Sequence, residues 1–93
     1  MDQAKLRVML VDDHEIVRRG IQQLLDGAED LRVVAEAGTV RDAVSEAAIA
    51  RPDVVVMDVR LAGGSGIEAT REIRSNLPHT KVLIFHPSMT TRR

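Results

Sequence analysis

The sequence contains no cysteine, tryptophan or tyrosine, and Phe85 is its only aromatic residue. Without cysteine there can be no disulfide bond and no thiolate metal site, which is compatible with a cytoplasmic protein. With a single aromatic residue the chain has almost no platform on which nucleic-acid bases can stack. The core must therefore be built from aliphatic side chains and methionine.

A strong charge of either sign and a long apolar run are missing too. The 93 residues carry a net charge of −1, which gives no reason to expect binding to nucleic acid or to a membrane surface. No apolar run approaches the roughly 20 residues of a membrane-spanning helix. The N-terminal residues, interrupted by charges, lack the layout of a signal peptide. We expect one small domain.

Apolar residues recur with periods that predict alternating strands and helices. Thr39 is a candidate helix cap, and Pro52 and Pro78 are expected to end the second and third helices. The order strand, helix, strand predicts an α/β fold with a parallel sheet and right-handed crossovers. The predicted strands cover residues 6–11, 31–38, 53–59 and 81–85, and the helices begin near residues 15, 40 and 67.

Acidic residues stand where two of these strands end. Asp12 and Asp13 follow the first strand, in "VMLVDDHE", and Asp58 ends the third, in "VVVMD". Because parallel strands share one direction, their carboxyl ends meet at one edge of the sheet, where open α/β sheets bind ligands. If the two strands are neighbours, we expect three carboxylates to converge.

Carboxylates that lie close together repel one another, and a hard divalent cation relieves the repulsion. Mg²⁺ prefers oxygen ligands and retains several waters, so two carboxylates and a main-chain carbonyl suffice to hold it. An aspartate beside such a cation can act as a nucleophile toward phosphoryl groups. The alternative is a purely structural role, in which these acids are turn residues or helix caps.

The segments "VMLVDDHEIVRRGIQQLL" and "RPDVVVMDVRLAGGSGIEATREI" resemble the receiver domain of bacterial two-component response regulators of the LuxR/NarL type. The resemblance implies a CheY-like, flavodoxin-like fold with sheet order 2-1-3-4-5 and helices on both faces. It implies that Asp58 accepts phosphate from a sensor histidine kinase, with Mg²⁺ held by Asp12, Asp13, Asp58 and the main-chain carbonyl of Arg60.

Three positions depart from the family pattern. His86 stands at the switch position, where receivers have a Thr or Ser whose hydroxyl bonds the phosphoryl group. The lysine that ends the family's fifth strand has no counterpart. Ala62 stands where proline is common, which is a milder change. The absence of the lysine and of the Thr or Ser supports an alternative to phosphate acceptance, a degenerate receiver that is not phosphorylated and acts through pairing with an intact receiver.

The resemblance also implies that the last helix, strand and helix of a receiver are missing. We expect residues 1–86 to be a partial receiver domain and 87–93 an irregular tail. One DNA sequence that encodes "MTTRR" reads Asp-Asp-Glu-Ala in another frame, and related receivers often have an acidic stretch at this place. We therefore expect a frameshift at or before His86. An incomplete domain would expose an apolar edge strand at 81–85, with low stability or dimerisation as consequences.

Other residues have simpler interpretations. His14 can be a metal ligand or a proton shuttle, but more often such a residue opens the next helix. The glycines of "LAGGSG" are expected in a flexible connection rather than a phosphate-binding loop, because the lysine of such a loop is missing. Arg18 and Arg19 are expected on the solvated face of the first helix.

The residues therefore favour a signalling module over an enzyme. A Mg²⁺-dependent phosphohydrolase using Asp58 remains the enzymatic alternative, but no general acid or substrate pocket is evident. Family members act on DNA through a helix-turn-helix domain. This sequence has none, so the chain alone is not expected to bind DNA. A homodimer, or a heterodimer with an intact receiver, is a possible assembly.

Overall fold

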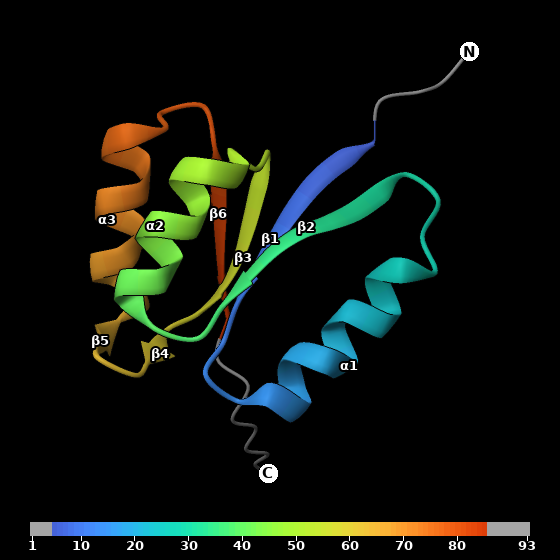
Figure 1. Cartoon of the computed structure of the whole chain (residues 1–93), viewed down its shortest axis with the longest axis horizontal. Coiled ribbons are helices and arrows are strands. Elements are labelled where there is room, and N and C mark those ends of the chain that lie inside the picture. The colour runs from blue at the N-terminus through green and yellow to red at the C-terminus, as the bar shows by residue number, and fades with distance from the viewer. Residues whose placement is uncertain (1–4, 86–93) are drawn as a thin grey trace, which may run out of the picture.

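The protein forms a parallel sheet with helices on both faces, as the sequence predicts. The computed structural model describes residues 5–85. Figure 1 shows α2 and α3 together on one face of the sheet and α1 on the other. The elements in chain order are β1 (Leu6–Val11), α1 (Glu15–Asp26), β2 (Leu31–Ala37), α2 (Val40–Ala50), β3 (Val54–Asp58), β4 (Arg60–Leu61), β5 (Gly64–Ser65), α3 (Gly66–Asn76) and β6 (Lys81–Phe85).

The main sheet has the strand order β2-β1-β3-β6, and its three neighbouring pairs are all parallel. Because β4 and β5 form a separate hairpin, β6 is the fourth strand of the main sheet in chain order. The order therefore matches the first four strands of the expected 2-1-3-4-5 arrangement. In the register of β1 and β3, Val11 lies opposite Met57. The residues that follow this pair are Asp12 and Asp58, so the pairing itself brings two carboxylates to the same edge of the sheet.

Capping residues in the sequence fix where α2 begins and ends. The Thr39 hydroxyl accepts a hydrogen bond from the Asp42 amide at 3.0 Å, which confirms the predicted cap. At the other end, Arg51 adopts a left-handed conformation with φ of 50° and is followed by Pro52. Proline cannot continue the hydrogen-bond ladder, so the helix stops there, as predicted.

The hydrophobic core lies between the sheet and the α2–α3 pair. Small alanines on both helices let them approach the strands closely, while methionine, valine and isoleucine fill the space between. On the opposite face, α1 has no fully buried residue. The core consists of Met9, Val11, Ala37, Ala43, Ala47, Val55, Met57, Leu61, Ala69, Ile73 and Leu77.

The two faces of β3 are therefore covered unequally. Val55 and Met57 are buried beneath α2 and α3, whereas Val54 and Val56 are only half-buried on the α1 side. The apolar run predicts burial on both faces, and the structure shows full burial on one. None of the helices in residues 5–85 is long and apolar enough to cross a membrane.

The strand β6 lies at the edge of the sheet within the described residues. It pairs with β3, and its apolar side chains Leu83 and Ile84 are 60% and 45% exposed. The exposed apolar edge expected from the sequence is thus present in residues 5–85. His86 and the tail 87–93 lie outside the described residues.

The segment "LAGGSG" differs from the flexible connection that the sequence suggests. Arg60–Leu61 and Gly64–Ser65 pair as a short antiparallel hairpin, β4 and β5. Gly63 and Gly64 have φ of 84° and 154°, values that glycine adopts readily and other residues avoid. Ser65 and Glu68 then form a capping box at the start of α3. The segment is ordered by turn and cap chemistry.

Two isoleucines on α3 provide a matched test of this packing. Ile73 is 1% exposed within the core and Ile67 is 53% exposed. We expect Ile73→Ala to lower the free energy of unfolding by about 2–5 kcal/mol, because it leaves a cavity. Ile67→Ala should change it by about 0.5 kcal/mol. Urea unfolding followed by circular dichroism measures both, and equal losses in the two variants would contradict the assigned core.

Candidate functional site: an acidic cluster at the carboxyl edge of the sheet

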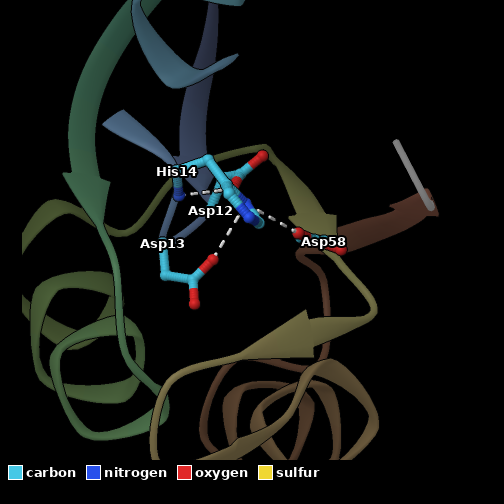
Figure 2. Close-up of side chains that lie close together, drawn as sticks. All are labelled: Asp12, Asp13, His14 and Asp58. Atoms are coloured by element: carbon cyan, nitrogen blue, oxygen red, sulfur yellow. Dashed lines mark hydrogen bonds and ion pairs between the residues drawn. The ribbon is translucent and has the colours of Figure 1, made fainter. Parts of the chain in front are cut away.

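Three carboxylates meet where β1 and β3 end. Asp12 and Asp58 are each 1% exposed, whereas the side chain of Asp13 is 34% exposed. Together with His14 they offer ligand atoms that all lie within 4.8 Å of one another (Figure 2). The predicted convergence of Asp12, Asp13 and Asp58 is therefore found, and it follows from the parallel pairing of the two strands.

Each buried carboxylate is held by a main-chain amide two residues further along the chain. The His14 amide donates to Asp12 Oδ1 at 2.8 Å, and the Arg60 amide donates to Asp58 Oδ1 at 3.1 Å. Aspartate often makes this contact where a chain turns. In both residues the contact uses Oδ1, so the same local geometry orients two side chains and leaves Oδ2 for another partner.

Both Oδ2 atoms are buried without a hydrogen-bond partner among the described residues. A buried carboxylate oxygen that lacks a partner is costly, and adjacent carboxylates add mutual repulsion. A hard divalent cation satisfies both conditions, because it bonds oxygen and neutralises charge. The donor set of Asp12, Asp13 and Asp58 therefore fits Mg²⁺.

The start of α3 packs directly against the main chain of Asp58. The Gly66 amide donates to the Val59 carbonyl at 2.8 Å, and a Cβ atom on Gly66 would clash with the Asp58 carbonyl. Glycine is needed here because of this close approach. In the sequence Gly66 is indistinguishable from the loop glycines that precede it, so its role in supporting Asp58 was not predicted.

The imidazole of His14 lies among the three acids. Its Nδ1 atom is 2.9 Å from Asp12 Oδ1, 3.0 Å from Asp13 Oδ1 and 3.8 Å from Asp58 Oδ2 (Figure 2). His14 is also the residue that precedes the first turn of α1, so the prediction that it opens a helix is confirmed. The sequence did not predict that the ring lies among the acids. Its only indication was that His14 follows the acid pair directly.

These contacts raise the pKa of His14 above its usual value of about 6.5. The largest cause is the hydrogen bond with Asp12, followed by the negative charge of Asp13, while desolvation acts in the opposite direction. A raised folded-state pKa means that folding favours the protonated ring. Its contribution to stability is therefore fully present below about pH 6.5 and is lost as the pH rises through the folded-state pKa.

The remaining predicted site residues are Arg60 and His86. Arg60 begins β4, two residues after Asp58, and its amide contacts that aspartate. The role of its carbonyl as a cation ligand stays a prediction. His86, at the expected switch position, lies outside the described residues.

For Arg18 the predicted solvated position is wrong. Its side chain is 21% exposed; Nε donates to Glu36 Oε1 at 2.9 Å and Nη1 donates to the Asp12 carbonyl at 2.5 Å. Arg19 is 72% exposed and pairs with Glu15 one turn away, as expected for a solvated face. Glu36 is a further residue near the site that the sequence analysis did not single out.

Residues 8–91 match the family described as the response regulator receiver domain. Over 80 residues the chain is 51% identical to the DNA-binding transcriptional activator DevR/DosR of Mycobacterium tuberculosis; the match covers 86% of this chain and 37% of that protein. It is 42% identical over 85 residues to the transcriptional regulatory protein YxjL of Bacillus subtilis, covering 91% and 39%. The chain thus spans less than two-fifths of these relatives.

Solved structures show the same fold. A LuxR-family response regulator from Aurantimonas superposes with a TM-score of 0.86 at 43% identity, covering 92% of this chain and 61% of that one. The receiver domain of NarL from Mycobacterium tuberculosis superposes with a TM-score of 0.84 at 28% identity, covering 95% and 71%.

The cluster geometry predicts how the His14 ring titrates in metal-free protein. We expect Asp13→Asn to lower the pKa of His14 relative to wild type, because it removes a negative charge 3.0 Å from Nδ1. Asp26→Asn makes the same chemical change about three helical turns away and should leave the His14 pKa at its wild-type value. NMR titration of the histidine ring measures both variants. Equal effects would show that the ring does not lie at the acids.

Proposed function

Because the chain belongs to the response regulator receiver domain family of two-component systems, we propose that it is a phosphoacceptor module whose Asp58 takes a phosphoryl group from a sensor histidine kinase. One observation carries this assignment. Asp58 is buried at the end of β3 with Oδ1 bonded to the Arg60 amide, while Oδ2 has no hydrogen-bond partner within residues 5–85. The main chain thus orients this carboxylate, which still has bonding capacity for a cation and for a phosphoryl group.

The proposed transfer forms a bond between a carboxylate oxygen of Asp58 and phosphorus. It breaks the bond between phosphorus and the histidine nitrogen of the kinase, so the products are an aspartyl phosphate and a free imidazole. The main-chain contacts at Arg60 and Gly66 hold Asp58 in place during this exchange. A nucleophile that is already oriented loses little further entropy in the transition state.

Mg²⁺ is the proposed cofactor, held by Asp12, Asp13, Asp58 and the Arg60 carbonyl. When bound, it would offset the negative charge of the carboxylates and of the incoming phosphoryl group. Asp12 is placed by its contact with the His14 amide, and Asp13 is the more exposed member of the set. Asp12 and Asp13 therefore bind and orient in this proposal, whereas Asp58 reacts.

In this proposal the modified group is Asp58 of the protein itself rather than an external substrate, so the module passes on a signal. DevR/DosR, of which this chain spans 37%, is a DNA-binding transcriptional activator. We propose that the present chain corresponds to the input part of such a regulator and makes no DNA contact of its own. Its location would be the cytoplasm, where it meets the kinase.

A small phosphodonor tests the proposal without the kinase. In acetyl phosphate and Mg²⁺, intact-mass measurement should show wild-type protein gaining the mass of one phosphoryl group. Asp58→Asn should show no gain, because the nucleophilic oxygen is lost. Asp26→Asn, an equivalent change at the exposed end of α1, should be phosphorylated as wild type.

The outcome separates the two functions considered. If folded wild-type protein gains no mass, Asp58 is not a phosphoacceptor, and a receiver that acts only through pairing is favoured. If Asp58→Asn gains as much mass as wild type, the modification lies elsewhere and the site assignment fails.

A further inference from the structure

Arg18 connects three parts of the molecule at the acidic cluster. It belongs to α1, its Nε donates to Glu36 of β2 at 2.9 Å, and its Nη1 donates to the main-chain carbonyl of Asp12 at 2.5 Å. Resting on the proposed cation site, we propose that Arg18, held by Glu36, is a positioning residue that fixes the peptide between Asp12 and Asp13 and thereby sets the affinity for Mg²⁺.

The carbonyl that Arg18 holds belongs to the peptide that leads into Asp13. Asp12 itself is secured independently, since its amide donates to the Ala37 carbonyl at 3.0 Å and its carboxylate accepts from the His14 amide. For the Asp13 carboxylate, the contact present in residues 5–85 is the His14 ring. The direction in which Asp13 leaves the main chain therefore depends on how this peptide is oriented, and Arg18 restrains its carbonyl.

Gly38, which follows β2, leaves room for the guanidinium. A Cβ atom on Gly38 would lie 3.4 Å from Arg18 Nη1 and 3.6 Å from the Asp13 Cα. The arginine thus passes close to the end of β2 on its way to the turn. A guanidinium is planar and presents its donors in a fixed fork, so engaging Glu36 on one side determines where Nη1 points on the other.

Arg18 also brings a positive charge near the cluster without occupying it. Its donors contact Glu36 and a main-chain carbonyl, so they do not use the carboxylate oxygens that would bind a cation. Taken by itself, the positive charge of Arg18 repels Mg²⁺ and so weakens its binding. Deleting the charge should therefore tighten binding if electrostatics dominates, and weaken binding if the positioning of Asp13 dominates.

The opposite signs make the substitution Arg18→Met informative. Methionine retains an unbranched stem and loses every donor. Arg19→Met is the matched control, because Arg19 is the next residue of the same helix and its guanidinium contacts Glu15 at the surface. The chain has no tryptophan or tyrosine to report by fluorescence, so Mg²⁺ binding is measured from amide shifts in NMR spectra at fixed pH.

We expect Arg18→Met to bind Mg²⁺ about tenfold more weakly than wild type, the loss typical when a residue that orients a metal ligand is removed. Arg19→Met should match wild type within about twofold. Binding by Arg18→Met that equals or exceeds that of wild type would overturn the proposal. If wild-type protein shows no Mg²⁺ shifts, the cation site itself fails, which is a separate result.

A second pair of variants keeps the test decisive if Arg18→Met does not fold. Glu36→Gln and Glu36→Met both remove one negative charge, but only glutamine retains an oxygen acceptor for Arg18 Nε. If Glu36 holds the arginine in position, Glu36→Met binds Mg²⁺ several-fold more weakly than Glu36→Gln. Equal affinities in these two variants would show that Glu36 acts through its charge alone, and the positioning role would be rejected.

Discussion

The parallel pairing of β1 with β3 is the constraint on which the site depends. With Val11 opposite Met57, the next residues place Asp12 and Asp58 side by side, each 1% exposed. The two carboxylates carry charges of the same sign, and because they are buried with little solvent between them, they repel strongly. The strand register therefore imposes an electrostatic cost that apolar packing elsewhere must offset. The residues around the acids are best understood as means of holding them in place while keeping one oxygen of each available.

Those means fall on the two faces of the sheet. On the face covered by α2 and α3, the full core supports β3, and Gly66 allows α3 to begin directly against Asp58. On the other face, Val8 and Leu10 of β1 are buried, but α1 has no fully buried residue, and polar contacts hold the turn that follows β1. Arg18 and the His14 amide secure the Asp12–Asp13 turn from that side. One wall of the site is thus positioned by close packing and the other by hydrogen bonds.

Much of this arrangement could be predicted from the sequence, for a physical reason. Hydrophobic period and terminal residues are local properties, and they predicted the bounds of β1 and β6 and the start of α1 as the structure has them. Parallel topology then implied that Asp12, Asp13 and Asp58 converge. The short hairpin of β4 and β5 has too few residues for a period to show. The reach of Arg18 to the Asp12 carbonyl and the position of the His14 ring depend on side-chain conformations that only the assembled sheet determines.

The claim that the acids form a cation site at an electrostatic cost is tested most directly by thermal unfolding with and without Mg²⁺, in wild type and in Asp13→Asn. A ligand that binds only the folded state raises the unfolding temperature, so Mg²⁺ should stabilise wild type. In metal-free buffer at a pH above the folded-state pKa of His14, where the ring is neutral, Asp13→Asn should unfold at a higher temperature than wild type, since it relieves repulsion. Its unfolding temperature should also respond less to Mg²⁺. An unfolding temperature of wild type that is unaffected by millimolar Mg²⁺ would contradict the account.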